Sequence, residues 1–473
     1  MQDFDMVVIG SGPSGQRAAV QAAKLGKQVA VVERYELGGV SINGGTIPSK
    51  TLREAVIDLS GLRQRSLYGD SFRVKAEISA QDLLMRTGLI MQREREVVRS
   101  QLLRNHVHLV EGAARFEGPH ELVVDGRDAT HRLQARYVVI AVGSTPGIPP
   151  GIEVDHRAVL TSDDILSLET LPRSLTVVGA GIIGVEYATI FAALGIEVVL
   201  LDKRPSLLEM VDAELVDALT YQARALGVTL RLGEEVERLE PGEAQTVVRL
   251  KSGKRFVTEM VLISAGRVGA TTGLGLDRAG VATDERGRIG VNEHYQTSVP
   301  HIYAVGDVIG FPALASTSME QGRLAACHAF GIPATSVPAL FPFGIYAIPE
   351  VAWVGSTEAD LTSKGAPFET GVARYREIAR GQILGDSDGM LKLIFRLDTG
   401  ELLGVWVLGT HAAELVHIGQ AVMALGGTLD YFITNVFNYP TLAECYKVAA
   451  LDGYNKVRSL NAVPARQAAG ERG

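Results

Sequence analysis

Cysteine is scarce in this chain. The 473 residues include only two cysteines, Cys327 and Cys445, which lie far apart in the sequence and in no CxxC pattern. This scarcity excludes both a disulphide framework and a cysteine-based zinc site. Because the ten histidines form no ligand pattern either, we predict no metal centre and expect both thiols to be buried, apolar groups.

Positive charge and long apolar runs are also lacking. The formal net charge is -8, which gives no electrostatic attraction to nucleic acid or to an anionic membrane. No run approaches the roughly 20 apolar residues of a membrane span, and a strand pattern begins by Asp5 with no basic, apolar leader before it. We therefore expect a cytoplasmic protein that binds small molecules, and neither nucleic acid nor a membrane.

Two stretches of the chain share one pattern. The first runs from Asp5 as DMVVIGSGPSGQRAAVQAAKLGKQVAVVER, and the second from Leu175 as LTVVGAGIIGVEYATIFAALGIEVVLLDKR. Each has an apolar run, a glycine-rich turn, an alanine-rich helical pattern and a β-branched run that ends in an acidic residue. One GxGxxG alone is weak evidence, because glycines are common in turns. Two of them, each at the start of a βαβ unit, predict two dinucleotide sites.

The glycines and the acidic residues of these two stretches are the candidate binding residues. Glycines allow a tight turn and a close approach of the backbone to a pyrophosphate, while the helix N-terminus offers unpaired N–H groups to the phosphates. The carboxylate accepts hydrogen bonds from ribose hydroxyls. The candidates are Gly10, Gly12, Gly15 and Glu33 in the first stretch, and Gly179, Gly181, Gly184 and Asp202 in the second.

The second acidic residue is followed by two cations. Asp202 alone favours NAD, because a carboxylate repels a 2′-phosphate. Lys203 and Arg204 come next and could neutralise that phosphate, with Arg able to bind it bidentately. We therefore predict that both NAD(H) and NADP(H) bind; the alternative is a solvated Lys-Arg pair.

Two dinucleotide sites in one chain imply an internal path for electrons. A tightly bound flavin and an exchangeable nicotinamide meet complementary needs, since one carries electrons and the other delivers or removes them as hydride. The residues themselves therefore indicate a flavin-dependent reductase with FAD as cofactor.

Further motifs resemble those of the FAD-dependent pyridine nucleotide–disulphide oxidoreductase superfamily. They are RYVVIAVGSTP at 136–146, HIYAVGDVIG at 301–310 and ISAGRVG at 263–269. The resemblance implies that the first βαβ unit binds FAD and the second binds NAD(P). It adds Gly39, Thr46, Lys50, Gly143, Gly306 and Asp307 to the FAD site, with Asp307 at the ribityl chain, and Gly266 to the NAD(P) site.

Within that superfamily the chain resembles the soluble, Si-specific pyridine nucleotide transhydrogenases, from residue 4 to about residue 460. The stretches that carry the resemblance are GTIPSK at 45–50, QTSVPHIYAVGDVIGFPALAS from Gln296, ARGQILGD from Ala379 and FNYPTLAE from Phe437.

Where the disulphide reductases have two redox cysteines, this chain has Ser41 and Thr46. The transhydrogenases share the threonine but retain the first cysteine, so Ser41 departs from their pattern. The histidine that serves the dithiol in the reductases corresponds to Tyr439, while Glu444 is still present. We therefore exclude an electron relay through a protein disulphide.

Lys50 and Glu186 are the candidate catalytic residues. The resemblance implies that they form an ion pair beside the N5 edge of the flavin. The Lys50 cation would stabilise the anionic reduced flavin, and the Glu186 carboxylate would hold the lysine and contact the nicotinamide amide. The alternative is a surface ion pair worth well under about 1 kcal/mol.

The expected architecture is an α/β fold with two Rossmann-like dinucleotide-binding domains and a C-terminal α+β dimerisation domain. Stretches rich in Pro and Gly supply the boundaries, and the resemblance implies a homodimer or a higher homo-oligomer. We predict an FAD-binding domain in two segments, 1–151 and 276–335, an NAD(P)-binding domain at 152–275, a dimerisation domain at 340–460 and a loose tail at 461–473.

The predicted activity is reversible hydride transfer from NADPH to NAD⁺ through bound FAD, by a ping-pong mechanism. The residues alone indicate a flavoprotein reductase without a dithiol, and only the resemblance selects transhydrogenase. An FAD-dependent NAD(P)H oxidase or quinone reductase is the first alternative. A non-catalytic flavin-binding redox sensor is the second.

Overall fold

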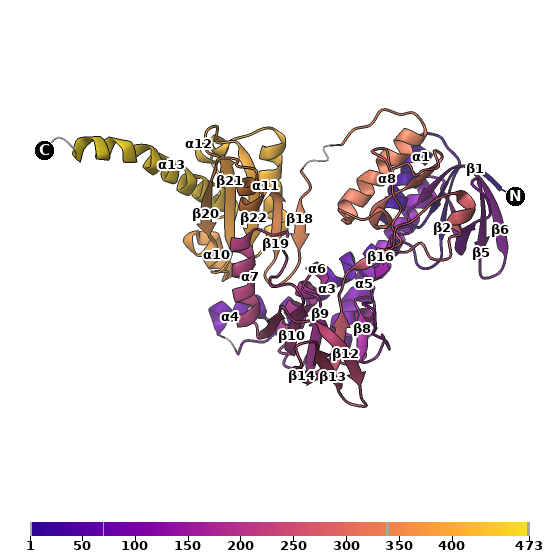
Figure 1. Ribbon diagram of the computed structural model, residues 1–473, viewed down its shortest axis with the longest axis horizontal. Coiled ribbons are helices and arrows are strands. Elements are labelled where there is room, and N and C mark those ends of the chain that lie inside the picture. Colours follow the sequence, from indigo (N-terminus) through magenta and orange to yellow (C-terminus); the bar gives the residue numbers. More distant parts are fainter. Residues whose placement is uncertain (1, 70, 337–339, 471–473) are drawn as a thin grey trace. The chain divides into compact units, whose positions relative to one another are not determined.

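The computed structural model describes residues 2–69, 71–336 and 340–470 (Figure 1). The chain divides into two compact units. The first unit comprises Met1–Leu52, Ser79–Leu171 and Leu262–Ser336. The second comprises Arg53–Ile78, Pro172–Val261 and Val337–Gly473. Each unit is therefore built from segments that are separated in the sequence, and each contains one of the two glycine-rich βαβ stretches.

The first unit is built on a sheet with strand order β3-β2-β1-β6-β5-β4, in which β17 also pairs with β6. Strand β1 is parallel to both β2 and β6. A central parallel strand is covered on both faces and is therefore apolar throughout. Successive residues point to opposite faces, so Met6 and Val8 enter one core and Val7 and Ile9 the other.

The elements of the first unit are β1 (Gln2–Ile9), α1 (Pro13–Lys24), β2 (Val29–Glu33), α2 (Gly39–Asn43), the start of α3 (Thr46–Ser60), α5 (Ala80–Arg104), β3 (His108–Glu111), β4 (Ala113–Phe116), β5 (Glu121–Asp125), β6 (Thr130–Ile140), β7 (Ser144–Pro146), β8 (Val159–Thr161), η1 (Asp164–Ser167), β16 (Arg267–Gly269), η2 (Leu276–Ala279), β17 (Ile302–Ala304), η3 (Gly306–Ile309) and α8 (Ala315–Ala329).

Helices α1 and α8 pack closely against each other in this unit. A Cβ at Gly322 of α8 would lie 2.0 Å from the carbonyl oxygen of Ser14, so no larger residue fits there. The contact holds the start of α1, which follows the first glycine-rich turn.

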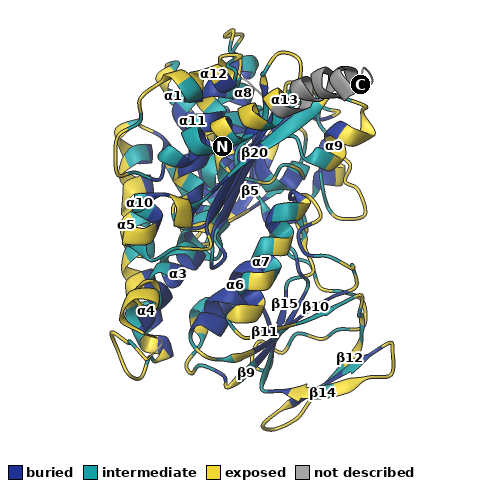
Figure 2. Ribbon diagram, turned by 90° about the vertical axis from the view of Figure 1, so that its left-hand side faces the viewer, coloured by how far each residue is buried: buried dark blue, intermediate teal, exposed yellow. Residues whose placement is uncertain are grey.

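The second unit contains a parallel sheet, a small antiparallel sheet and a larger antiparallel sheet. In the parallel sheet β10 lies between β9 and β11. The small sheet, β12-β13-β14, is largely exposed at β14 (Figure 2). Helix α6 connects β9 to β10 and is buried from Gly184 to Ala193. A helix that is apolar on all sides belongs in a core, so the buried Glu186 is an exception in this helix.

The elements of the second unit before the C-terminal region are the rest of α3, α4 (Leu62–Tyr68), β9 (Ser174–Val178), α6 (Ile182–Ala193), β10 (Glu197–Asp202), α7 (Ala213–Ala225), β11 (Val228–Leu232), β12 (Val236–Pro241), β13 (Thr246–Leu250), β14 (Arg255–Thr258) and the first half of β15 (Met260–Ile263). Its C-terminal region contains β18 (Phe343–Ile345), β19 (Val351–Gly355), α9 (Glu358–Ser363), β20 (Phe368–Arg374), η4 (Tyr375–Glu377), α10 (Ala379–Leu384), β21 (Met390–Arg396), β22 (Leu402–Leu408), α11 (Ala412–Ala424), α12 (Leu429–Thr434) and α13 (Glu444–Gly470).

The C-terminal region forms the larger antiparallel sheet, with order β18-β19-β22-β21-β20. Its core combines strand residues such as Leu393 and Val405 with residues of α11 and α13, including Val416 and Tyr446. Two parallel βαβ regions and a C-terminal α+β region therefore confirm the predicted fold class.

The predicted loose tail at 461–473 overlaps the last helix of the chain. Helix α13 runs from Glu444 to Gly470, so most of that segment is helical. Adding residues to a helix that already exists is far easier than starting one, and helical structure can therefore continue where the apolar periodicity has ended.

Among the described residues, no helix combines the length and the apolar character needed to cross a bilayer.

Candidate flavin and nicotinamide sites

The first glycine-rich turn has the shape that a pyrophosphate requires. Gly10 has a φ of +105°, and a Cβ at Gly15 would lie 2.0 Å from the carbonyl oxygen of Gly10. Gly12 caps α1, and a Cβ placed there would meet no atom within 4 Å. Gly10 and Gly15 thus permit the turn, while Gly12 leaves space in front of the helix N-terminus, where a phosphate is favoured. These residues fit a dinucleotide.

The carboxylate of Glu33 is held by neutral donors. It accepts hydrogen bonds from the N–H and the hydroxyl of Ser11, at 2.9 and 2.7 Å, and from the N–H of Tyr35 at 3.0 Å. The Ser11 hydroxyl also accepts the N–H of Gly38 at 2.9 Å. Ser11 was not among the predicted residues, although its position between the motif glycines was a signal that could have identified it.

The segment that replaces the redox dithiol is held by hydrogen bonds. Ser41 lies in α2 and donates to the carbonyl of Gly38 at 3.0 Å. The side-chain amide of Asn43 donates to three main-chain carbonyls, and its oxygen accepts a hydrogen bond from Arg95 at 2.7 Å. Thr46 begins α3 and is exposed. Neither Asn43 nor Arg95 was among the residues predicted from the sequence.

The backbone of Gly39 approaches the first glycine-rich turn. Its φ is +60°, and a Cβ there would lie 2.9 Å from the Cα of Gly12. The structure thus brings this predicted FAD residue next to the predicted phosphate position.

The predicted ribityl carboxylate, Asp307, lies in the same unit. The hydroxyl of Ser144 donates to it at 3.0 Å and accepts from Nε of Arg267 at 2.8 Å. Gly306 has a φ of +81°, and a Cβ there would lie 2.7 Å from the hydroxyl oxygen of Ser14. Gly306 therefore lies against the start of α1.

Gly10 also lies close to the end of strand β6, since a Cβ there would be 2.4 Å from the carbonyl oxygen of Ala141. Gly143, with a φ of +69°, follows two residues later. The first turn, Gly143 and the stretch at 306–307 thus lie near the carboxyl ends of parallel strands, where α/β sheets bind ligands.

The second glycine-rich turn has the same form in the second unit. Gly179 has a φ of +110°, Gly181 caps α6 with open space around a Cβ, and Gly184 is buried in the helix. The carboxylate of Asp202 at the end of β10 accepts the N–H of Ala180 at 2.6 Å. These four residues also fit a dinucleotide.

Among the residues that the structure describes, Asp202 has a cationic partner that Glu33 lacks. Nε and Nη2 of Arg204 donate to its two oxygens at 3.0 and 2.6 Å. Burial by itself would raise the pKa of Asp202, but the hydrogen bonds from Arg204 and from the Ala180 N–H lower it below its usual value. Lys203 is exposed, so the two cations predicted to act together occupy different environments.

The two candidate catalytic residues belong to different units. Lys50 lies in α3 in the first unit, partly buried, with its ammonium 3.3 Å from the hydroxyl of Ser49. Glu186 lies in α6 in the second unit, is 3% exposed, and accepts the N–H of Tyr346 at 2.8 Å. Gly266 lies in the first unit with a φ of +102°, and its carbonyl accepts the N–H of Gly147.

Comparison with known proteins identifies relatives of the chain. Residues 4–322 match the pyridine nucleotide-disulphide oxidoreductase family, and residues 341–450 match the dimerisation domain of that family. The chain belongs to the pyridine nucleotide-disulphide oxidoreductase family. A soluble pyridine nucleotide transhydrogenase from Mycobacterium tuberculosis is 55% identical, over 98% of this chain and 99% of its own. One from Colwellia psychrerythraea is 42% identical, over 96% and 99%.

Solved structures of the family have the same fold. LpdA from Mycobacterium tuberculosis superposes with a TM-score of 0.87 at 26% identity, over 95% of this chain and 99% of its own. The HOCl-induced flavoprotein disulfide reductase RclA from Escherichia coli gives 0.86 at 26% identity, over the same shares. The family confirms FAD as the cofactor and nicotinamide nucleotides as the substrates, and its dimerisation domain supports a homo-oligomer.

The thiol chemistry of the family's disulphide reductases has no counterpart in this chain's cysteines. Cys327 and Cys445 are both buried, as predicted. Burial raises the pKa of Cys327, and it raises the pKa of Cys445 to about 12. Tyr439, which the sequence resemblance places opposite the reductases' histidine, is 68% exposed.

Two further features of the second unit do not coincide with the predicted site residues. Three carboxylates, of Asp212, Glu214 and Glu358, lie together, but the ammonium of Lys392 contacts all of them and supplies the positive charge.

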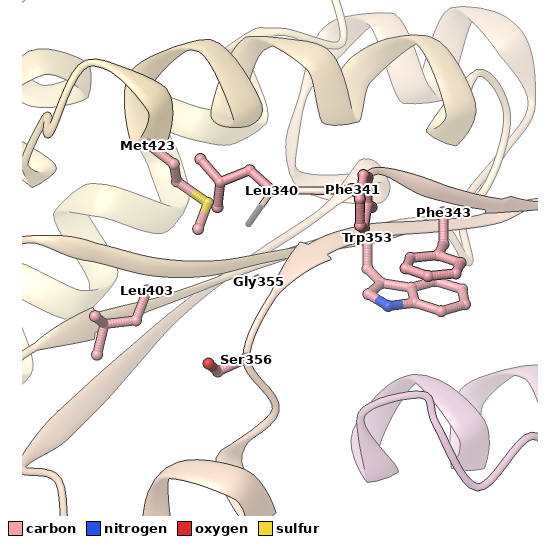
Figure 3. Close-up of a pocket in the computed structure, with 8 residues that line it drawn as sticks. All are labelled: Leu340, Phe341, Phe343, Trp353, Gly355, Ser356, Leu403 and Met423. Carbon is pink, nitrogen blue, oxygen red and sulfur yellow. The ribbon is translucent and has the colours of Figure 1, made fainter. Parts of the chain in front are cut away.

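A pocket of about 290 Å³ lies in the C-terminal region, where the rings of Phe343 and Trp353 stack (Figure 3). Its lining consists of Leu340, Phe341, Phe343, Trp353, Gly355, Ser356, Leu403 and Met423. None of these side chains titrates near neutral pH.

Proposed function

We propose that this chain is a Si-specific pyridine nucleotide transhydrogenase, which transfers hydride reversibly between NADPH and NAD⁺ by a ping-pong mechanism. The observation that carries the proposal is the combination of two intact dinucleotide turns with Ser41 and Thr46 in place of a dithiol. Relatives with the name soluble pyridine nucleotide transhydrogenase, at 42% to 55% identity over nearly the whole chain, support it.

Bound FAD supplies a carrier for two electrons, which the two nicotinamides use in turn. The residues of the first unit would hold it: the space at Gly12 would admit the pyrophosphate, Glu33 would accept hydrogen bonds from the ribose, and Asp307 would accept one from the ribityl chain. Lys50 provides a cation that stabilises negative charge on the reduced cofactor. Glu186 contacts the carboxamide of the nicotinamide and thereby orients its ring.

The second unit selects the nicotinamide nucleotide through Asp202 and Arg204. With NAD(H), the Asp202 carboxylate accepts from the ribose hydroxyls while Arg204 remains its partner. With NADP(H), the Arg204 guanidinium turns to the 2′-phosphate, for which its planar fork is suited. Lys203, being exposed, adds a weaker attraction through solvent.

The assembly and location are part of the same proposal. A homodimer, formed through the C-terminal region that matches the family's dimerisation domain, is the expected form. The expected location is the cytoplasm, where both nicotinamide pools occur as dissolved substrates.

Anaerobic reduction of the flavin tests the function. NADPH should bleach the flavin absorbance, and subsequent addition of a thio-NAD⁺ analogue should restore it with formation of the reduced analogue. Lys50→Met should slow both half-reactions while FAD remains bound. An unreactive thio-NAD⁺ together with rapid oxygen consumption in air would instead indicate an oxidase, and flavin that NADPH cannot reduce would contradict catalysis altogether.

A further inference from the structure

The carboxylate of Glu186 is hydrogen-bonded to a turn in the C-terminal region. The turn runs from Tyr346 to Glu350, between β18 and β19, and its first N–H donates to Oε1 of Glu186 at 2.8 Å. Both partners lie within the second unit. Because the donor is a main-chain group, the direction from which it approaches the carboxylate depends on the conformation of the turn.

Thr189 fixes the turn to the same helix. It lies three residues after Glu186 in α6 and is 1% exposed. Its hydroxyl accepts the N–H of Ile348 at 3.0 Å, and it lies 2.9 Å from the carbonyl oxygen of Val185. The hydroxyl thus satisfies a buried main-chain donor that would otherwise lose its partner, and it does so two residues from the N–H that holds Glu186.

Arg53 holds the turn from another side. Its Nε donates to the carbonyl of Ala347 at 2.9 Å, and its Nη1 lies 3.2 Å from the carboxylate of Glu350. The side chains of Arg53 and Glu350 are only 5% and 9% exposed. A buried guanidinium with both a carbonyl and a carboxylate partner has little freedom to move, so residues 347 and 350 are fixed by one side chain.

We propose that Thr189 and Arg53 are positioning residues for Glu186. They hold the Tyr346–Glu350 turn so that the Tyr346 N–H fixes the orientation of the Glu186 carboxylate. This inference rests on the proposed contact between Glu186 and the nicotinamide. Small displacements of an orienting group reduce the rate of a transfer that depends on alignment, so loosening the turn slows reduction of the flavin without any contact between Thr189 and the nucleotide.

Two substitutions at one position provide the sharpest test. Thr189→Val keeps the shape but removes the hydroxyl, whereas Thr189→Ser keeps the hydroxyl. In holoenzyme with a full complement of FAD, Thr189→Val should slow flavin reduction by NADPH about tenfold, and Thr189→Ser should restore it to within about twofold. Equal rates for the valine variant and the wild type would overturn the inference.

A double-mutant cycle with Glu186→Gln separates positioning from a general loss of packing. If Thr189 acts through Glu186, Thr189→Val should have almost no further effect on the reduction rate in the Glu186→Gln background. A tenfold loss in both backgrounds would overturn the inference and leave the proposed function standing. If Glu186→Gln alone reduces flavin at the wild-type rate, the proposed role of Glu186 itself is wrong.

Arg53 gives an independent variant should Thr189→Val not fold. Arg53→Lys keeps the charge near Glu350 but loses the rigid fork through which Nε and Nη1 reach Ala347 and Glu350, and it should slow flavin reduction in the same Glu186-dependent way. Arg63→Lys is its matched control: both arginines form an ion pair with Glu54, but the Arg63 side chain is 38% exposed. A slower rate in the control, or an unchanged rate in Arg53→Lys, would count against the inference.

Discussion

The two glycine-rich turns of this chain have the same backbone form but differ in the charges around the carboxylate that follows each turn. In both, the helix cap is a glycine with open space before it, and the second strand ends in a carboxylate. In the first unit the described donors to Glu33 are the neutral groups of Ser11 and Tyr35. In the second, Asp202 is bound by the Arg204 guanidinium through both of its oxygens.

This difference fits the proposed roles of the two turns, in which the first holds a resident cofactor and the second an exchangeable substrate. The Glu33 carboxylate has only neutral donors among its described partners, and a carboxylate without a cation beside it suits the ribose of a dinucleotide that has no 2′-phosphate. The Asp202–Arg204 pair is nearly neutral as a whole, and the Arg204 side chain is 33% exposed. A cation with access to solvent can move to a phosphate and return, which supports the proposal that the second site accepts both NAD(H) and NADP(H).

Matched substitutions at the two helix caps should have the largest effects, each on the affinity of one dinucleotide. Gly12 and Gly181 both have extended backbone, with φ of -65° and -79°, and both have open space for a Cβ. Alanine should therefore be tolerated by the fold but occupy the phosphate position. We expect Gly12→Ala to weaken FAD binding, and Gly181→Ala to weaken nicotinamide binding with FAD retained, each by about 100-fold, or roughly 2.7 kcal/mol.

Flavin release and nicotinamide titration measure these two affinities. Gly88→Ala in the exposed face of α5 is the control, since its Cβ also meets nothing within 4 Å; it should change neither affinity and should raise the free energy of unfolding by about 0.5–1 kcal/mol. If Gly12→Ala retained FAD with wild-type affinity, the assignment of the first turn would be wrong.

Removing the cation at the second site should have a smaller effect, on the affinity for NADPH relative to NADH. Arg204→Ala should weaken NADPH binding by about 10- to 100-fold, because a hydrogen bond to a charged group contributes roughly 1.5–3 kcal/mol. NADH should lose much less, since it has no 2′-phosphate. Arg204→Lys should recover part of the NADPH affinity through its charge alone. Equal losses for NADPH and NADH in stopped-flow titrations would contradict the proposed selection.

The paired carboxylate should also leave a signature in the pH dependence of stability. The folded-state pKa of Asp202 is lowered, so its contribution is fully present above the unfolded pKa of about 3.9 and is lost as the pH falls through the lower folded value. Arg204 stays protonated throughout. The free energy of unfolding of the wild type should therefore exceed that of Asp202→Asn by a constant amount above about pH 5, and the difference should shrink below about pH 4.

Unfolding curves of both proteins between pH 6 and pH 3 would measure this difference. A gap that persisted undiminished at the lowest pH would mean that the Asp202–Arg204 pair contributes nothing to stability.

Much of the fold could be predicted from the sequence, because its signals are local. Apolar runs before Gly10 and Gly179 and a carboxylate after each second strand identify βαβ units without any knowledge of the partners of those strands. The family was likewise predictable from short stretches such as GTIPSK, and it is confirmed. The roles of individual residues at the flavin and nicotinamide remain predictions.

What the sequence could not give are contacts between residues far apart in the chain. Arg53 and Ala347 are separated by almost 300 positions, and Thr189 and Ile348 by about half that distance. No periodicity or motif reports such pairs, because they depend on how strands and helices pack. The helical conformation near the C-terminus was not predicted either, because α13 continues to Gly470 after the apolar periodicity of the sequence has ended.

The smallest expected effect concerns the two cysteines, and it separates this chain from the disulphide reductases of its family. A thiolate is required to attack a disulphide. Cys445, with its pKa raised to about 12 by burial, stays protonated at neutral pH, as does Cys327, whose pKa burial also raises. Replacing both by serine should therefore change the rate of hydride transfer from NADPH to thio-NAD⁺ by less than about twofold, apart from a loss of packing.

The wild type should reduce neither lipoamide nor glutathione disulphide, and its transhydrogenation should survive arsenite and alkylating agents. Rapid turnover of dihydrolipoamide by the purified protein would contradict this prediction, because Ser41 and Thr46 offer no redox couple through which such electrons could pass.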